Sequence, residues 1–341
     1  MTITRRTFAT GAASLAAASL LGPREAQAAG SLISAIPPGA WEDAYRAVVV
    51  PALKANSGID VAFEALFAVD EIAKVRAARG NPPFDVFLLD PGPRATAIDY
   101  NLFEPFDAKR LKNADKLPPS LMDKYGVAVA AQVVGIGYNP KKLPKPTGWK
   151  DLFKPEFASH LALTGFQTTF GTMCLIEIAK AFGGSETDVE PAFAQIAKIL
   201  PQVAAVAAPG ALPGLFQQGQ VDLMYINTQT VTALQGRGVS IEFVVPDTGG
   251  SAFVNTMHIT KGSKNVDQAY EYMDTVLSTP VQDALAKPPY YLTPVNKDVD
   301  PGPGVPMRSV ADLEKFNTYN WTKINPLRAK WIDRFNKEMT K

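Results

Sequence analysis

A long run of apolar, often β-branched residues covers positions 125–140 and is interrupted near its middle by one polar side chain, Gln132. Asn139 and Pro140 close the run. This pattern predicts an extended strand that exceeds the usual strand length of ~5–6 residues. A strand of this length can leave one sheet and enter another. The alternative is an ordinary central strand of a single sheet.

The chain before this run alternates short apolar strands with segments whose apolar residues recur at helical spacing. An order of β-α-β-α-β-α is typical of a doubly wound sheet. The predicted strands are 31–36, 59–64 and 84–89, and the predicted helices are 41–55, 69–79 and one that ends at Asn101.

A second unit of the same kind follows the long run, and it also predicts a doubly wound sheet. Its predicted strands are 160–164, 203–206, 221–226 and 241–245. Its predicted helices are 149–153, one that ends at Phe182, 189–200, 209–218 and 228–235.

A second long extended run at 250–260 is the natural return crossing between the two units. The two runs form a pair, as a hinge requires. Helices predicted at 266–277, 280–286, 310–316 and 321–339 complete the chain. The sequence therefore predicts two doubly wound α/β lobes that are joined by two crossing hinge strands.

Composition limits the classes of function that fit this architecture. A chain of 341 residues is long enough for two domains of ~100–200 residues each. Its 34 basic residues balance its 33 acidic residues, and no basic stripe predicts a nucleic-acid partner. The single cysteine, Cys174, excludes an intramolecular disulfide and lies in an apolar run, where a small buried hydrophobe is expected.

The first 28 residues have the layout of a signal peptide. Arg5 and Arg6 precede an Ala-rich apolar segment at 11–21, and residues 26–28 form a small-x-small cleavage site. The arginine pair predicts a twin-arginine signal that is cleaved after Ala28, with a general secretory signal as the alternative. No later run reaches the ~18 apolar residues of a membrane span.

The enzyme signatures that can be searched for in a single sequence are missing. The two histidines, His160 and His258, both fall at predicted strand positions, where a structural role is the usual one. No Walker loop, dinucleotide-binding glycine pattern, nucleophile elbow or metal-ligand cluster is found. We therefore predict no catalytic residue, no metal and no cofactor.

Polar and aromatic residues instead gather where strands end, which is where doubly wound sheets bind ligands. Trp41 follows the first strand as either core or a stacking wall, and Phe67 follows the second with a preference for the core. Asp90 follows the third strand, where it either caps the next helix or faces a ligand. Gln132 needs a partner in its apolar strand, which is either backbone or ligand.

In the second unit, the densest polar turn holds hydroxyl and amide groups at the start of a helix, so that it either caps the helix or binds a ligand. Phe253 and Asn255 share one face of the return strand at period two. These considerations add the following candidate ligand-binding residues: Gln167, Thr168, Thr169, Tyr225, Asn227, Phe253, Asn255, Tyr290 and Tyr291.

Together with the export signal and the two crossings, five short segments resemble the bacterial extracellular solute-binding proteins of family 1, which include polyamine-, ferric-iron- and thiamine-binding proteins. The segments are 84–86 with Asp90, 135–140, 219–222, 257–265 and 290–296.

The resemblance implies the type II periplasmic binding protein fold, with one lobe at 29–134 and 252–297 and the other at 135–251 and 298–341. It also implies a monomer in the periplasm that works with the permease and ATPase subunits of an ABC importer.

Two departures from this family's pattern bear on the ligand. Asn255 stands where polyamine binders of this family carry an acid. Tyr225 has no neighbouring tyrosine, whereas the iron binders of this family use a tyrosine pair there, so the resemblance argues against ferric binding. A small polar organic solute that carries an amine, or is polyamine-like, is favoured. The alternatives are a phosphonate, thiamine-like or ferric ligand, or an exported hydrolase or lyase on the same fold.

Overall fold

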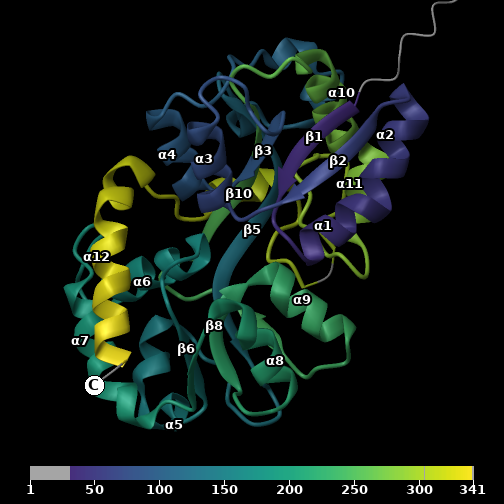
Figure 1. Cartoon of the computed structure of the whole chain (residues 1–341). Helices are drawn as coiled ribbons and strands as arrows, with labels where there is room; N and C mark the ends of the chain where they lie inside the picture. The colour runs from purple at the N-terminus through teal and green to yellow at the C-terminus, as the bar shows by residue number, and fades with distance from the viewer. Residues whose placement is uncertain (1–30, 303, 340–341) are drawn as a thin grey trace, which may run out of the picture.

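The computed structural model describes residues 31–302 and 304–339, so the predicted signal peptide lies outside the described residues. Figure 1 shows two α/β lobes, one above the other, with β5 passing between them. The upper lobe in this view carries β1 to β3, and the lower lobe carries β6 and β8.

The first lobe is built on three parallel strands in the order β2-β1-β3, to which β10 adds in the antiparallel direction. Its strands are β1 (Ser31–Ile36), β2 (Asp60–Ala65), β3 (Val86–Leu89), β4 (Met122–Asp123) and β10 (Ser251–Ile259). Its helices are α1 (Ala40–Ala44), α2 (Val50–Ser57), α3 (Ala68–Ala77), α4 (Pro91–Asp99), α10 (Val266–Leu277) and α11 (Thr279–Ala286).

The helix predicted at 41–55 forms with an irregular middle. A π-helical turn at Tyr45–Val49 separates α1 from α2. Pro51 lies in the first turn of α2, and it has no N–H to donate to the preceding turn. The register of the helical hydrogen bonds therefore changes just before the proline.

The long strand β5 (Gly126–Tyr138) is buried along all 13 residues. Its first part pairs with β10 through residues 127–134, and its last part pairs with β8 (Leu223–Asn227) through residues 134–138. The prediction that one strand serves both lobes is confirmed. The ladders also join, so that a single sheet of order β2-β1-β3-β10-β5-β8-β6-β7 runs through the molecule.

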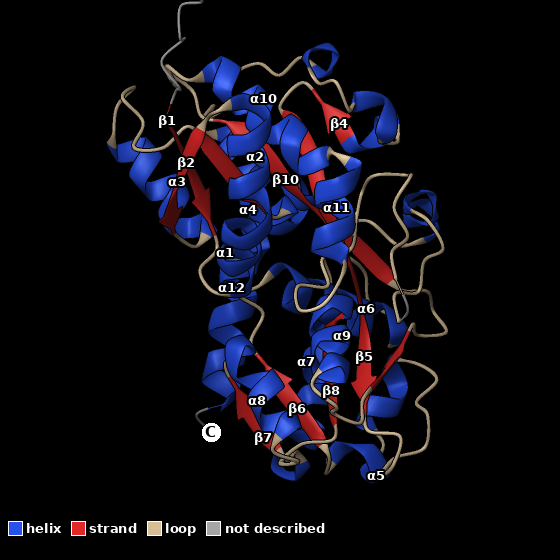
Figure 2. Cartoon of the chain, turned by 90° about the vertical axis from the view of Figure 1, so that its right-hand side faces the viewer, coloured by secondary structure: helices blue, strands red, loops and turns tan. Residues whose placement is uncertain are grey.

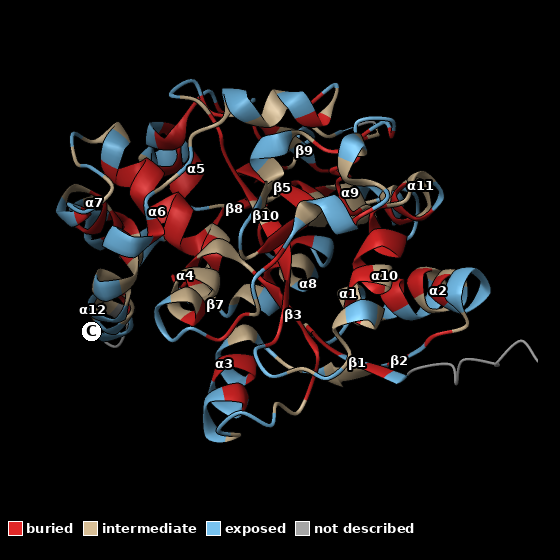
Figure 3. Cartoon of the chain, turned by 90° about the horizontal axis from the view of Figure 1, so that it is seen from above, coloured by how far each residue is buried: buried red, intermediate tan, exposed pale blue. Residues whose placement is uncertain are grey.

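The second lobe repeats the α/β arrangement around β8, with helices on both sides of its strands (Figure 2). Its other strands are β6 (Leu161–Thr164), β7 (Ala205–Ala207) and β9 (Glu242–Val244). Its helices are α5 (Pro155–Ala158), α6 (Thr169–Ala181), α7 (Glu190–Ile199), α8 (Leu212–Gln217) and α9 (Thr228–Gly236). Among them, α6 is buried over most of its length, as Figure 3 shows.

The remaining helical segments are short. The predicted helices at 149–153 and 310–316 form as 3₁₀ helices, and the one at 209–218 begins with a 3₁₀ turn before α8. The 3₁₀ helices are Ala108–Arg110, Ala114–Lys116, Pro119–Leu121, Trp149–Phe153, Leu200–Gln202, Pro209–Ala211 and Val310–Lys315.

The C-terminal helix α12 (Trp321–Met339) lies along one side of both lobes (Figure 1). Its apolar residues, among them Ile324 and Trp331, belong to the core of the second lobe. Asn325 donates from Nδ2 to the carbonyl oxygen of Gly92 in α4, at 2.7 Å. The helix therefore connects the second lobe to the first lobe outside the crossing strands.

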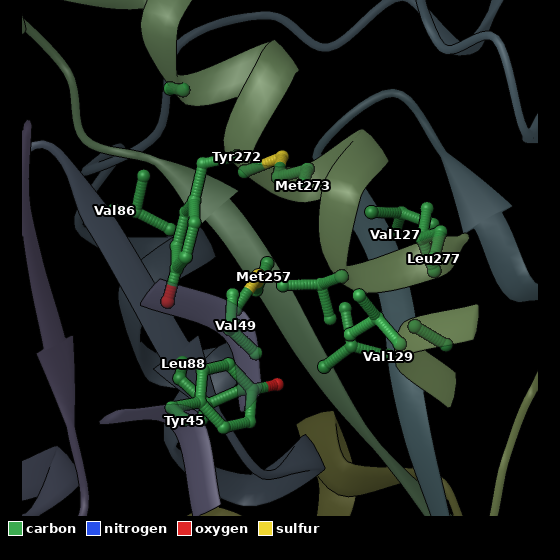
Figure 4. Packing of buried hydrophobic residues seen from close by; sticks show 14 of the residues in the cluster. Tyr45, Val49, Val86, Leu88, Val127, Val129, Met257, Tyr272, Met273 and Leu277 are labelled. Carbon is green, nitrogen blue, oxygen red and sulfur yellow. The ribbon is translucent and has the colours of Figure 1, made fainter. Parts of the chain in front are cut away.

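Each lobe has its own apolar core, and β5 contributes to both. Val127 and Val129 pack in the first core with α2, β3 and α10 (Figure 4), whereas Val134 and Ile136 pack in the second core with α6 and α7. Smaller clusters cover the opposite face of the sheet in each lobe. A run that is apolar on both faces suits a strand that is covered from both sides.

None of the helices in the described part of the chain combines the length and the apolar character that a membrane crossing needs.

Candidate ligand-binding site

A cavity of about 340 Å³ lies where the two lobes face each other. It is bounded by the ends of β1, β2 and β3, by β5 and β10, and by the first turns of α6 and α9. The ends of the strands therefore bring most of the expected residues together, as predicted from the sequence. Those that line the cavity are Trp41, Phe67, Asp90, Gln132, Gln167, Thr168, Thr169, Asn227, Phe253 and Asn255.

Three of the expected residues lie elsewhere. Tyr225 is 1 % exposed in the second core, where its hydroxyl donates to the carbonyl of Thr164 and accepts from the N–H of the same residue. Its side chain points into the lobe, because β8 places alternate residues on opposite faces. Tyr225 therefore does not face the cavity, contrary to the expectation.

The two tyrosines after α11 are also outside the cavity. Tyr290 packs against the core of the first lobe. Tyr291 lines a separate space of about 610 Å³ between α9 and α11. Asp283 of α11 and Lys287, which follows this helix, line that space and pair with each other at 2.6 Å. Thr232, Gln235 and Asp300 line it as well, and Tyr291 is the one candidate residue among its described lining residues.

A chain of side-chain amides crosses the floor of the cavity. Asn227 donates from Nδ2 to Oε1 of Gln132 at 2.7 Å, and Gln132 donates from Nε2 to Oδ1 of Asn255 at 2.8 Å. Asn255 in turn donates from Nδ2 to Oδ1 of Asp90. The partner that Gln132 needs is thus neither backbone nor ligand but two neighbouring amides. The chain runs from the end of β8 in the second lobe, through both hinge strands, to the residue that follows β3 in the first.

Asp90 faces the cavity rather than capping α4. It stands at the N-cap position, but its side chain accepts no capping hydrogen bond. Burial raises the pKa of Asp90, while hydrogen bonds from Thr169 and Asn255 and the charge of Arg328 act in the opposite direction. A buried carboxylate with a raised pKa gains stability when a cation approaches it.

Two other cavity residues do cap helices. Thr168 accepts from the N–H of Gly171 at 3.1 Å at the start of α6, and Asn227 accepts from the N–H of Thr230 at 3.0 Å at the start of α9. Both side chains also line the cavity. Capping and ligand contact, which the sequence presented as alternatives, are therefore compatible at these positions.

Aromatic side chains form the apolar walls. Phe67 is 63 % exposed, so the expectation that it prefers the core is wrong, and the neighbouring Val69 is 77 % exposed. Trp41 is half-buried beside Tyr45, at 6.0 Å between ring centroids, and Phe253 lies on the hinge strand. Large apolar groups that face solvent inside a concave site are typical of a surface that a ligand covers.

Arg328, which no sequence pattern had indicated, reaches the cavity from α12. Its Nε donates to Oγ1 of Thr172 at 3.1 Å, and one terminal nitrogen donates to the carbonyl of Gln167 at 2.7 Å. Burial lowers the pKa of Arg328, and the charge of Asp90 acts against that shift. Strand ends cannot reveal this residue, since it comes from a C-terminal helix that only the tertiary fold brings to the site.

A second acidic side chain lies behind the cavity without lining it. Glu71 on α3 is 0 % exposed, and no other side chain hydrogen-bonds to its carboxylate oxygens. Burial raises the pKa of Glu71 well above its usual range, and the charge of Asp90 raises it further. Glu71 is therefore harder to ionise than an exposed carboxyl group, although a hydrogen bond from the backbone of Leu88 acts in the opposite direction.

The histidines and the cysteine lie away from the cavity. His258 is fully buried, stacks on Phe103 and has its pKa lowered to about 3 by burial. His160 contacts Asp222 at 3.1 Å, and Cys174 is buried within α6. No group of three or more His, Cys, Asp or Glu side chains that could hold a metal occurs among the described residues.

Solved structures share this fold. The chain superposes on an ABC transporter protein from Clostridium perfringens with a TM-score of 0.75 at 22 % sequence identity, covering 90 % of this chain and 99 % of that one.

Two relatives from Escherichia coli are named as periplasmic binding proteins. The spermidine/putrescine-binding periplasmic protein of Escherichia coli is 27 % identical over 209 residues, which span 57 % of this chain and 58 % of the relative. The putrescine-binding periplasmic protein PotF of the same organism is 22 % identical over 335 residues, which span 83 % and 89 % of the two chains.

The family match covers more of the chain than the first of these relatives does. Residues 47–312 match the family described as bacterial extracellular solute-binding protein, and that segment includes both crossing strands and all the cavity residues except Trp41, Pro37 and Arg328. The chain therefore belongs to the bacterial extracellular solute-binding proteins.

Proposed function

We propose that the chain is the substrate-binding component of an ABC importer and captures a small polar organic solute that carries an amine. The observation that carries this proposal is the carboxylate of Asp90, which the amide chain holds at the cavity floor beneath aromatic walls. A charge-assisted hydrogen bond to Asp90 would fix the amine, and Trp41 offers a ring face to its cation. The polyamine ligands in the names of the relatives support the same choice.

Capture occurs by closure of the two lobes about β5 and β10. A ligand that contacts Asp90 of the first lobe and Thr168 of the second stabilises the closed arrangement by the difference in its affinity for the two states. The closed protein, as a monomer, then docks on the permease of an importer that is driven by its ATPase subunits.

We infer that the cavity binds its solute without chemical turnover. Its lining holds one carboxylate and no histidine, cysteine, serine or lysine among the described residues. The side chain of Thr169 hydrogen-bonds to that carboxylate and so helps to hold it in place. Loss of a turnover activity on substitution of Asp90 or His160 would revive the enzyme alternative.

The proposal places the mature protein in the periplasm, after removal of residues 1–28 by cleavage behind Ala28. The periplasmic relatives support this location. Amino-terminal sequencing of the protein from the producing cell tests it, and an intact Met1 in the mature protein would contradict it.

Thermal unfolding in the presence of amines, amino acids, phosphonates and vitamins tests the function. A solute at a hundredfold excess over its Kd adds about 2.7 kcal/mol to the free energy of unfolding, which is a clear shift in Tm. Asp90→Asn should remove the shift that an amine produces, and X-ray scattering should show a smaller radius of gyration with the solute. If no compound raises Tm and none compacts the protein, the proposal fails.

A further inference from the structure

The charges of the cavity are one anion and one cation. Among the described residues that line it, Asp90 and Arg328 are the ones that carry charge. Asp90 comes from the first lobe at the end of β3, and Arg328 comes from α12, which packs with the second lobe. The site is therefore dipolar, whereas a molecule with two ammonium groups gains a charge-assisted hydrogen bond at each end only where two anions are present.

Asn255 does not supply a second anchor for an amine. Its Oδ1 already accepts from Gln132, and its Nδ2 donates to Asp90, so both ends of its amide are engaged within the protein. Its part is to orient the carboxylate of Asp90.

Glu71 does not supply a second anion either. It lies outside the cavity lining and is fully buried, and ionisation there is opposed by burial and by the charge of Asp90. The formal charge that the protein offers to a ligand at this end of the cavity is therefore that of Asp90 alone.

Arg328 favours an anion on its side of the cavity. Arg328 has five N–H donors, and its two hydrogen bonds, to Thr172 and to the carbonyl of Gln167, leave others available. The guanidinium lies beside the first turn of α6, where the helix dipole adds positive potential and the side chain of Thr169 hydrogen-bonds to Asp90. A second ammonium group placed there would meet a cation that is already poorly hydrated.

We propose that the solute is a small zwitterion, with its ammonium group on Asp90 and a carboxylate on Arg328. This inference rests on the proposed binding function and names the ligand class for the same cavity. The short apolar stem between the two charges packs on Phe67 and Phe253. A volume of about 340 Å³ is at the small end of ligand sites and suits a molecule of this size.

Isothermal titration with four-carbon compounds that differ only in their end groups tests the inference. The probes are 4-aminobutanoate, 1,4-diaminobutane, butylamine and butanoate, with ω-amino acids from glycine to 6-aminohexanoate to find the best length. The best amino acid should bind at least about tenfold more tightly than the diamine of equal length, because only it satisfies both charges.

Two variants test which side chain of the protein binds each end of the solute. Arg328→Gln should weaken binding of the amino acid at least about tenfold more than it weakens binding of butylamine, while Arg328→Lys should retain part of the affinity for the amino acid. Asp90→Asn should weaken the binding of both the amino acid and butylamine.

The outcomes separate the two levels of the proposal. Tighter binding of the diamine than of every amino acid overturns the zwitterion and leaves the binding function intact. If Arg328→Gln weakens the binding of all the probes equally, the zwitterion proposal is also overturned, since the arginine would then act only on the fold or on the lobe arrangement. If none of these probes and no solute of the wider thermal screen binds, the proposed function itself fails.

Discussion

At the scale of single residues, the position of the carboxylate in the cavity depends on the hydrogen bonds of one amide, that of Asn255. An acid at position 255 would place two carboxylates side by side, and one of them would have to remain protonated. Asn255 instead links Asp90 to Gln132 and Asn227 through donors and acceptors that match. Satisfying these buried groups avoids a cost of ~1–3 kcal/mol for each polar group that would otherwise lack a partner.

Glu71→Gln should stabilise the protein at neutral pH. The folded-state pKa of Glu71 is raised, so the folded protein resists an ionisation that the unfolded chain undergoes above its usual pKa near 4.5. This side chain therefore costs stability that grows as pH rises, by about 1.4 kcal/mol per pH unit until the folded-state pKa is reached. Urea unfolding should show the variant more stable than the wild type at pH 7 and similar to it at pH 4. A difference that does not change with pH would contradict this.

Tyr225→Phe should reduce stability without reducing ligand affinity. The phenolic oxygen is bonded to both the N–H and the carbonyl of Thr164, and its loss leaves these buried groups unpaired at a cost of ~1–3 kcal/mol. The measurements are urea unfolding and titration with a solute identified by the thermal screen. If a fully folded variant bound the solute more weakly, Tyr225 would contribute to the binding site after all.

At the scale of elements, the crossing strand β5 works because its ends fit two different neighbours. Gly126 lies at its start, where an added Cβ would collide with the carbonyl oxygen of Met257 and the ring of His258. The two hinge strands approach each other closely there, which explains a glycine inside a strand.

Gly126→Ala should destabilise the protein by ~1–3 kcal/mol, because backbone atoms of β10 must move to accept the methyl group. The matched control is Gly214→Ala in α8, where nothing lies within 4 Å of the added Cβ. That change should be neutral or add up to ~1 kcal/mol, since alanine favours helix over glycine. Chemical unfolding of both variants is the measurement, and an equal response of the two would contradict the close-packed crossing.

At the scale of the whole molecule, the lobes touch at more places than the hinge. Besides α12 on α4, the hydroxyl of Tyr291 from the first lobe lies against Gly236 at the end of α9 in the second. A contact of this kind, away from the ligand, contributes to the balance between lobe arrangements, and so to apparent affinity.

Gly236→Ala should shift that balance, because its Cβ would occupy the place of the Tyr291 hydroxyl. We expect a larger radius of gyration without ligand in X-ray scattering, and affinity that is weaker by a factor on the order of ten or less. Gly210→Ala in the same lobe, with open space around the new methyl group, is the control. Unchanged scattering and affinity would show that this contact has no part in the equilibrium.

Much of the architecture follows from local pattern. The apolar runs at 125–140 and 250–260 formed β5 and β10, and helical spacing at 266–277 and 321–339 formed α10 and α12. Strand ends placed Asp90, Thr168, Asn227 and most of the other candidate residues in one cavity, because the topology of a doubly wound sheet brings those ends together.

The local pattern could not predict features that depend on contacts between residues distant in sequence. Whether Tyr225 points inward, and whether Phe67 is exposed, depends on which face of each element meets a core. Arg328 carries no local signal for binding, and only the path of α12 along both lobes brings its charge to Asp90. The sequence by itself determined the two lobes, the crossing strands and the carboxylate, since these follow from periodicity and strand order. The tertiary structure alone decided the second charge of the site, because electrostatic partners are set by distance in space.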